Sequence, residues 1–150
     1  MTSLYRISRK ENRTEDIGGA MRNPGRWHVP GQAVLYFSSS LPLAILEMKA
    51  NGAPFSELRE AYRYGHIEAK VGSGESESVP ENFFKKDWTL SLEASRAYGS
   101  QWFKERRSLI LEVKSAVLPV EKNYLVNTAH PAFARIQFPK PLGIPLDTGV

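Results

Sequence analysis

The sequence of 150 residues contains no cysteine and only three histidines. Without cysteine, a disulfide framework, a thiol nucleophile and a thiolate metal site are all excluded. The histidines form no HExxH pair of the kind that binds zinc, and no zinc-finger spacing is present. We therefore expect no metal at the functional site.

Long hydrophobic runs are missing as well. No segment approaches the roughly 20 apolar residues that a membrane-spanning helix needs. Arg6, Arg9 and Lys10 interrupt the first segment, so it lacks the apolar centre of a signal peptide. We expect a cytoplasmic protein with no membrane contact. The sequence also has no P-loop, no dinucleotide-binding GxGxxG motif and no GxSxG elbow.

The remaining composition is ordinary for one globular domain over residues 1–150. Hydrophobic residues make up 41% and charged residues 24% of the chain, and no repeat or linker divides it. The formal net charge is +4, but the basic residues are scattered apart from short pairs such as Lys85-Lys86. Such a charge suits an anionic small molecule or an acidic partner protein as well as nucleic acid. We expect no direct nucleic-acid binding.

The order of apolar patterns, turn residues and helix signals predicts a mixed α+β chain. Segments 9–24 and 72–78 are predicted to be loops, and the proline-rich tail 139–150 is predicted to be irregular. A helix over residues 88–107 is expected to break at Gly99. The predicted strands cover residues 4–7, 33–37, 67–71, 109–113, 123–127 and 134–138, with a strand start at 62–64, and the other helices cover 40–51 and 54–61.

The stretch Gly25–Glu47 contains three chemically distinctive residues. It consists of a Gly/Pro turn carrying Arg26, an apolar strand carrying Tyr36 and a helix carrying Glu47. A planar guanidinium on a turn suits bidentate contact with phosphate or carboxylate, although a solvated surface arginine is the alternative. Tyr36 shares one strand face with Val34, where a tyrosine is also a common core residue.

Glu47 lies in the middle of the predicted helix, whose N-cap is Ser39 or Ser40. No cation occupies a position three or four residues away, so the helix supplies no partner for this carboxylate. A carboxylate without a partner is costly to bury, and such groups cluster at functional sites. A long-range ion pair is the alternative. If the helix folds back on the strand, Arg26, Tyr36 and Glu47 can face one cleft.

Arg26, Tyr36, Glu47 and Ser115 carry a resemblance to a known family. The chain resembles RES-domain proteins, which are named for an arginine, a glutamate and a serine. They are the toxin half of type II Xre–RES toxin–antitoxin systems. The matching pieces follow one another over nearly the whole chain, and besides these four residues they include Leu4–Ile7, Gly25–Trp27, Gly31, Val34–Ser38, Ala44, Trp88, Gly99, Trp102, Val113–Val117, Asn123–Asn127 and His130-Pro131.

The resemblance implies an α+β fold similar to ADP-ribosyltransferases of the bacterial-toxin type, with a split β core flanked by helices. It implies NAD as the substrate, with hydrolysis or phosphorolysis of the nicotinamide–ribose bond. On that basis Glu47 is predicted to stabilise the charge that develops on the ribose, with Ser115 either orienting Glu47 or binding the ribose. Arg26 is predicted to hold the diphosphate or the nicotinamide ribose. Arg6 is predicted to add a second phosphate contact and Tyr36 to stack on nicotinamide.

The resemblance also implies a cognate helix-turn-helix antitoxin of the Xre family and a toxin homodimer within the complex. The acceptor of the ADP-ribosyl group stays open between water, phosphate and a protein side chain. The alternative functions are a protein ADP-ribosyltransferase, a catalytically inactive binding module and a nucleic-acid-binding protein. Two positions depart from the family pattern. Lys114 replaces a frequent proline, and the tail Leu146–Val150 replaces a Phe-Asp-x-Arg-Leu-like segment, which leaves the role of Asp147 open.

Overall fold

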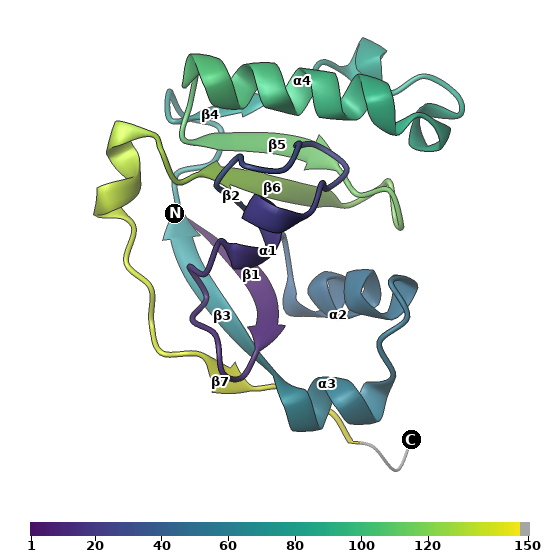
Figure 1. Cartoon of the computed structure of the whole chain (residues 1–150), viewed down its shortest axis with the longest axis vertical. Coiled ribbons are helices and arrows are strands. Elements are labelled where there is room, and N and C mark those ends of the chain that lie inside the picture. Colours follow the sequence, from purple (N-terminus) through teal and green to yellow (C-terminus); the bar gives the residue numbers. More distant parts are fainter. Residues whose placement is uncertain (148–150) are drawn as a thin grey trace.

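A computed structural model describes residues 1–147 of the protein. These residues form a seven-stranded sheet flanked by helices (Figure 1). None of the helices in this described part is both long enough and apolar enough to cross a membrane. The strands are β1 (Thr2–Arg9), β2 (Val34–Ser38), β3 (Tyr62–Ala69), β4 (Ser76–Ser78), β5 (Ile110–Lys114), β6 (Lys122–Asn127) and β7 (Leu142–Gly143), the helices are α1 (Gly18–Arg22), α2 (Leu41–Ala50), α3 (Phe55–Ala61) and α4 (Leu92–Glu105), and 3₁₀ turns cover Glu81–Phe83, Trp88–Leu90 and Pro131–Arg135.

The sheet is split between β1 and β2. Its strand order is β4-β5-β6-β2-β1-β3-β7, and all pairs are antiparallel except the parallel pair β4–β5. Strands β1 and β3 pair along their whole length, whereas β1 and β2 share only the pair Tyr5–Ser38. The two halves therefore diverge, and their strands run in different directions in Figure 1. The expected α+β fold with a split β core flanked by helices is confirmed.

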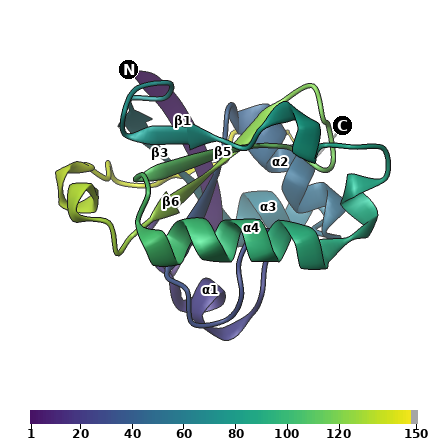
Figure 2. The same ribbon diagram turned by 90° about the horizontal axis from the view of Figure 1, so that it is seen from above.

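Side chains alternate between the two faces of the sheet, as the period of a strand requires. Val34 and Tyr36 of β2 point to the face covered by α4, whereas Leu35 and Phe37 point to the opposite face. Figures 1 and 2 show α4 running alongside β5. The α4 face buries Trp27, Trp102, Leu111, Val113 and Leu125, and the opposite face buries Leu4, Ile67, Ile110, Val126 and Ala132.

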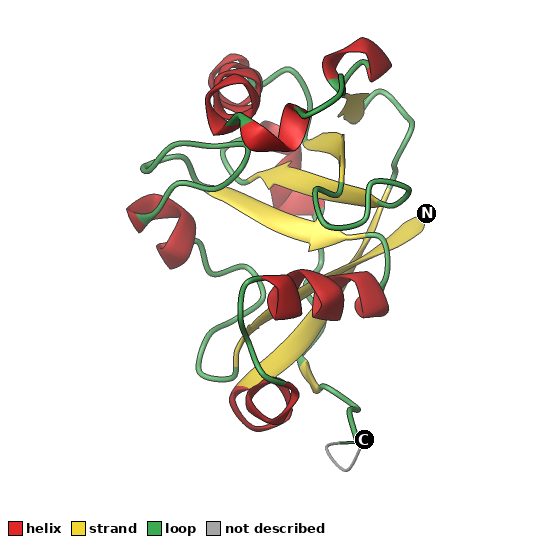
Figure 3. Cartoon of the chain, turned by 90° about the vertical axis from the view of Figure 1, so that its right-hand side faces the viewer, coloured by secondary structure: helices red, strands yellow, loops and turns green. Residues whose placement is uncertain are grey.

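Helix α2 lies against β1 and β2, where the two halves of the sheet separate. The Ser40 hydroxyl accepts a hydrogen bond from the Leu43 backbone N–H, so Ser40 is the N-cap, and Pro42 occupies the first turn. Leu43 and Ala44 are buried on the inner side of the helix. Figure 3, which looks onto the right-hand side of Figure 1, shows α2 in front of the strands. Glu47 lies one turn after Leu43 and therefore faces the split.

Helix α4 runs without interruption from Leu92 to Glu105, so the predicted start at residue 88 and the predicted break at Gly99 are wrong. Residue 88 begins a separate 3₁₀ turn. Gly99 is buried, and a Cβ at this position would collide with the carbonyl oxygen of Trp27. A glycine within a helix costs about 1 kcal/mol relative to alanine. Here it permits the close approach that holds the loop carrying Arg26.

The loop and tail predictions also need correction. Segment 9–24 contains α1, segment 72–78 contains β4, and the tail contains β7. Strands β4 and β7 are only three and two residues long, and pairing with β5 and β3 stabilises them, so they show no sequence period. The predicted strand 134–138 does not form, because a 3₁₀ turn runs through Arg135 and the following Ile136 packs onto the core. Residues 148–150 of the predicted tail lie outside the described residues.

Candidate functional site

Two adjoining cavities lie where the sheet splits. One has a volume of about 300 Å³ and is bounded by β1, β2 and α2. The other has a volume of about 420 Å³ and is bounded by the loop before β2, the start of α4 and the end of β5. Arg6 lines the first cavity and Arg26 the second. The two cavities are parts of one cleft, because five residues line both: Gly25, Tyr36, Glu47, Asn51 and Asn123.

The Glu47 carboxylate is held at the centre of this cleft by two neutral donors. The Ser115 hydroxyl donates to Oε2 at 2.8 Å, and the Asn123 amide donates to the same oxygen at 2.5 Å. Within residues 1–147, Glu47 forms no ion pair and no hydrogen bond through Oε1. The long-range ion pair considered for Glu47 is therefore not formed. One oxygen fixes the orientation of the carboxylate, and the other is left for a ligand.

Ser115 is fully buried and does not line the cleft itself. Its hydroxyl oxygen accepts hydrogen bonds from the backbone N–H groups of Val117, at 3.2 Å, and Leu118, at 3.0 Å. A serine hydroxyl has one proton to donate, and here that proton goes to Glu47. This geometry favours the first of the two predicted roles of Ser115, which is to orient Glu47.

Asn123 is a site residue that sequence reasoning did not identify. Its amide oxygen accepts a hydrogen bond from the buried hydroxyl of Ser38 at 3.0 Å, which orients the NH₂ group towards Glu47. The register of the sheet places Ser38 of β2 directly opposite Asn123 of β6. The polar start of the segment 123–127 was visible in the sequence, but the strand pairing that gives it a partner was not.

Arg26 lies on a loop that is packed from both sides. The adjacent Trp27 is buried, and a Cβ at Gly25 would collide with the Tyr36 hydroxyl. The Arg26 guanidinium donates to the Thr89 carbonyl oxygen at 3.1 Å and lies 5.6 Å from the centre of the Trp88 ring. Arg26 forms no ion pair within the described residues. It is half-buried on the wall of the cleft, so the solvated surface arginine is not what the structure contains.

The Tyr36 hydroxyl is held by two neighbours while its ring lines the cleft. His28 Nε2 contacts the Ala20 carbonyl oxygen at 3.1 Å, so this nitrogen carries the proton and Nδ1 accepts from the Tyr36 hydroxyl at 2.9 Å. The Trp27 backbone N–H donates to the same hydroxyl oxygen. Burial raises the pKa of Tyr36 and lowers the pKa of His28, so both side chains are neutral at pH 7. The predicted stacking of Tyr36 on nicotinamide stays a prediction.

Arg6 holds the backbone around the split. Its guanidinium donates to the carbonyl oxygens of Thr14 at 3.0 Å, Asp16 at 3.3 Å and Tyr36 at 3.4 Å. These contacts connect β1 to β2 and to the loop that follows β1. Burial is the main cause that lowers the pKa of Arg6. The second phosphate contact stays a prediction, because all three guanidinium nitrogens of Arg6 already have a backbone partner.

Two further cations line the larger cavity and were not predicted as site residues. Lys114 forms an ion pair with Glu81 at 2.5 Å. Arg96 of α4 donates through Nε to the Gly25 carbonyl oxygen at 2.7 Å. Arg96 precedes Gly99 by one helical turn on the same side of α4. The predicted break at Gly99 concealed this relation, because two separate helices would not share one face.

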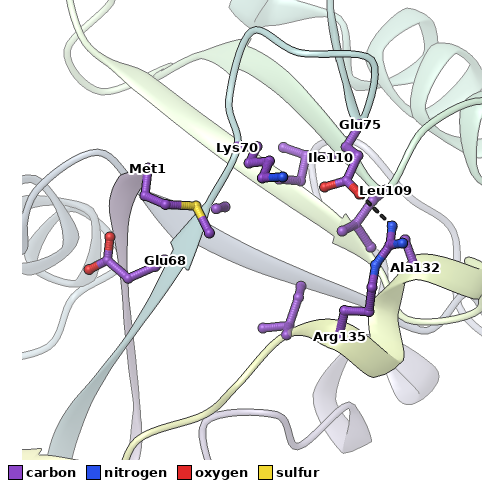
Figure 4. Close-up of a pocket in the computed structure, with 10 residues that line it drawn as sticks. Met1, Glu68, Lys70, Glu75, Leu109, Ile110, Ala132 and Arg135 are labelled. Atoms are coloured by element: carbon purple, nitrogen blue, oxygen red, sulfur yellow. Dashed lines mark hydrogen bonds and ion pairs between the residues drawn. The ribbon is translucent and has the colours of Figure 1, made fainter.

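A third cavity of about 270 Å³ lies away from the cleft and contains none of the predicted site residues. Figure 4 shows its wall, where the Glu75 carboxylate faces the Arg135 guanidinium in an ion pair. Apolar side chains, including Leu109 and Ile110, line this cavity together with Glu68 and Lys70. Residues 1–147 contain no group of three or more histidines and carboxylates arranged to hold a metal ion.

Comparison with known proteins gives the family. The model of the RES domain matches residues 3–147 of the chain. The chain belongs to the RES domain family. It is 31% identical to the "Prs ADP-ribosylating toxin" of Sphingobium sp. (strain YBL2), over 87% of this chain and 84% of that protein. It is 30% identical to a "Toxin Res" of Pseudomonas putida, over 75% of this chain and 77% of that protein.

The fold of this RES domain is also found in a solved structure. A chain in the crystal structure of the M. tuberculosis MbcT-MbcA toxin–antitoxin complex superimposes with a TM-score of 0.77 at 16% sequence identity. The match covers 95% of this chain and 84% of that chain. Of the residues that the sequence predicted to match the family name, Glu47 and Ser115 are in direct contact, and Arg26 lines the same cavity as Glu47.

Proposed function

We propose that this RES domain is the toxin of a toxin–antitoxin system and that its cleft binds NAD and cleaves the nicotinamide–ribose bond. The observation that carries the proposal is the Glu47 carboxylate, whose Oε2 is held by Ser115 and Asn123 while Oε1 has no partner within residues 1–147. A charged group kept without a counter-ion beside a cleft is a feature of binding and catalytic sites.

The chemistry of the bond supports a single carboxylate as the main catalytic group. When the C1′–N bond breaks, its electron pair leaves with nicotinamide, which becomes neutral, and the ribose ring takes up positive charge. A preorganised negative charge next to that ring stabilises the transition state more than the ground state. In this proposal, Oε1 of Glu47 hydrogen-bonds a ribose hydroxyl of NAD. Ser115 and Asn123 keep the carboxylate in that orientation.

The rest of the cleft supplies features suited to the rest of NAD. Tyr36 presents a neutral aromatic ring to both cavities, which suits stacking on nicotinamide. Arg26 presents a guanidinium, which suits the diphosphate. The oxygen of water or of phosphate then attacks C1′, and a proton is released to solvent when the acceptor is water. The protein needs no metal for either step in this proposal.

The alternative is a protein ADP-ribosyltransferase, in which a protein side chain attacks C1′ in place of water or phosphate. The specific support is the 31% identical relative named an ADP-ribosylating toxin. Cleft and carboxylate serve both reactions equally well, so the two functions differ only in the acceptor. For both functions we propose that the protein acts in the cytoplasm and that a cognate antitoxin binds it. The similarity to a toxin crystallised with its antitoxin supports such a partner.

The test is the consumption of NAD by the purified chain with and without inorganic phosphate, with the products identified by mass. Free ADP-ribose without phosphate identifies a hydrolase, and ADP-ribose 1″-phosphate formed only with phosphate identifies a phosphorylase. Transfer of label from NAD to a protein in a cell extract, with little free product, identifies the ADP-ribosyltransferase. Unchanged NAD in all three mixtures, with a protein that unfolds cooperatively, would reject the proposed function.

A further inference from the structure

The cavity that contains Glu47 also contains an arginine for which the family resemblance predicted no role. Arg96 of α4 lines the 420 Å³ cavity together with Arg26, Tyr36 and Glu47. Its side chain is half-buried, and within residues 1–147 it forms no ion pair. Lys114, the third cation of this cavity, is already paired with Glu81. The unpaired charge of Arg96 is costly unless an anion enters the cavity.

The contacts of Arg96 fix its guanidinium and leave the outer nitrogens available. Nε donates to the Gly25 carbonyl oxygen at 2.7 Å, and neither Nη1 nor Nη2 has a hydrogen-bond partner among residues 1–147. A guanidinium held through Nε has lost most of its rotational freedom, so less entropy is lost when the other two nitrogens bind a ligand. By contrast, one outer nitrogen of Arg26 is already bonded to the Thr89 carbonyl oxygen.

The two arginines line the same cavity, and contacts between α4 and the loop before β2 position both of them. Helix α4 contacts the loop that carries Arg26 through two residues one helical turn apart. Arg96 donates a hydrogen bond to the Gly25 carbonyl oxygen, and Gly99 packs against the Trp27 carbonyl oxygen. Arg26 is the residue between these two points. Burial is the main cause that raises the pKa of Tyr36, and the positive charges of Arg96 and Arg26 both act against that rise. Both charges therefore act on the same phenol group, which lines the 420 Å³ cavity together with the two arginines.

We infer that Arg96 and Arg26 together bind the diphosphate of the substrate and that Arg96 makes the cleft selective for a dinucleotide over a mononucleotide. The inference rests on the proposed function for the identity of the substrate. Two guanidinium charges match the two charges of a diphosphate, and the fork of Arg96 suits bidentate contact with phosphate oxygens. With the diphosphate bound by the two arginines, the adjoining ribose lies in the same cavity as Glu47. A ligand with one phosphate engages only part of this pair.

The experiment measures the affinity of ADP-ribose by calorimetry, because ADP-ribose contains the diphosphate but no nicotinamide–ribose bond. Arg96→Gln removes the charge, and Arg96→Lys keeps the charge while removing the fork. The matched control is Lys104→Gln, which removes one positive charge from an exposed position of the same helix. We expect Arg96→Gln to weaken binding about 10- to 100-fold, as for a lost charge-assisted hydrogen-bonding group. The ADP-ribose affinity of Arg96→Lys should lie between those of the wild type and Arg96→Gln. Lys104→Gln should change this affinity less than about twofold.

A second ligand tests the selectivity. The wild type should bind ADP-ribose more tightly than AMP, and Arg96→Gln should reduce this difference, because AMP lacks the second phosphate. Equal ADP-ribose affinities in the wild type and folded Arg96 variants would overturn the inference, and so would no measurable ADP-ribose binding by the wild type. If Arg96→Gln does not fold, Arg96→Lys decides the question. If the wild type cleaves NAD but ADP-ribose binding does not depend on Arg96, the inference is rejected and the proposed function is kept. If ADP-ribose binding depends on Arg96 but NAD is not cleaved, the proposed function is rejected and the inference about binding is kept.

Discussion

The cleft and the third cavity each contain a carboxylate, and the two carboxylates have opposite kinds of partner. In the third cavity the Glu75 carboxylate and the Arg135 guanidinium are paired with each other (Figure 4). In the cleft, Glu47 is held by neutral hydrogen-bond donors, and it does not pair with Arg26 or Arg96 across the same cavity. Lys70 and Glu68 also line the third cavity, but its Glu75 carboxylate is already neutralised by the guanidinium beside it. The cleft keeps one negative and two positive groups available.

This difference distinguishes an ion pair that stabilises the fold from charged groups that are available to bind a ligand. Pairing two charges at a surface stabilises a fold only slightly, because water already solvates both groups. Keeping charges apart in a half-buried cleft costs stability. Ser115 and Asn123 reduce this cost by donating hydrogen bonds to Glu47, and backbone carbonyl groups reduce it by accepting hydrogen bonds from the arginines. The arrangement suits a ligand that carries both signs. NAD has a positive nicotinamide ring and a negative diphosphate.

The largest predicted effect comes from substituting the glutamate of the cleft, Glu47, and comparing the result with substitution of Glu75 in the third cavity. Glu47→Gln keeps the volume and the hydrogen bonds of the side chain but removes its charge, and we expect NAD turnover to fall about 1,000-fold or more. Glu75→Gln removes one partner of an exposed ion pair, and we expect turnover within about twofold of the wild type. Initial rates of nicotinamide release measure both. Equal activity of Glu47→Gln and the wild type would show that Glu47 has no catalytic role.

Gly99 tests how strongly packing of α4 fixes the wall of the cleft that carries the arginines. Gly99→Ala places a methyl group against the Trp27 carbonyl oxygen, and we expect a loss of about 3 kcal/mol in the free energy of unfolding. The control is Gly19→Ala in α1, where no atom lies within 4 Å of the added Cβ. That change should be neutral or slightly stabilising, since alanine favours a helix by roughly 1 kcal/mol. Denaturation with urea measures both, and equal stabilities would mean that α4 accommodates the methyl group.

Asn123 and Ser115 test whether neutral donors are sufficient to orient Glu47. We expect Asn123→Ala and Ser115→Ala each to lower kcat about 10- to 100-fold with little change in KM, because the carboxylate remains but is free to turn. Among residues 1–147 the Ser38 hydroxyl donates its hydrogen bond to Asn123, so its loss should have a smaller effect in the same direction. Steady-state kinetics measures these values. A rise in KM at constant kcat would instead mean that Asn123 binds the substrate directly.

The central unit of this RES domain could be predicted because its pattern is local. The apolar run 33–37, the serine at the cap of α2 and the mid-helix position of Glu47 are all visible over about 20 residues, and the structure contains each of them. A local cap also precedes Pro131, where His130 Nδ1 accepts a hydrogen bond from the Ala132 backbone N–H at 3.0 Å. Local rules of capping and periodicity were enough for these elements.

The parts that could not be predicted depend on contacts between distant segments. Asn123 becomes a site residue only because β6 pairs with β2, and Arg96 only because α4 continues through Gly99. A glycine in a helical pattern is commonly a break, and only its proximity to the Trp27 carbonyl shows why it is needed here. The strands β4 and β7 likewise exist through their partners. Sequence period and composition contain no record of these contacts.

The smallest predicted effect concerns His28 and Tyr36, the two neutral side chains that are hydrogen-bonded to each other next to the cleft. Burial lowers the pKa of His28, so as the pH falls the unfolded chain takes up a proton at about 6.5, before the folded protein does. Stability should therefore decrease as the pH falls from about 6.5 to the lower pKa of the folded state, and be unaffected by His28 above that range. Protonation would also prevent Nδ1 from accepting the Tyr36 hydroxyl. We expect the wild type to lose on the order of 1 kcal/mol more than His28→Gln between pH 7.5 and 5.5. Urea denaturation at both pH values measures this, and equal losses would mean that His28 can be protonated in place without disturbing Tyr36.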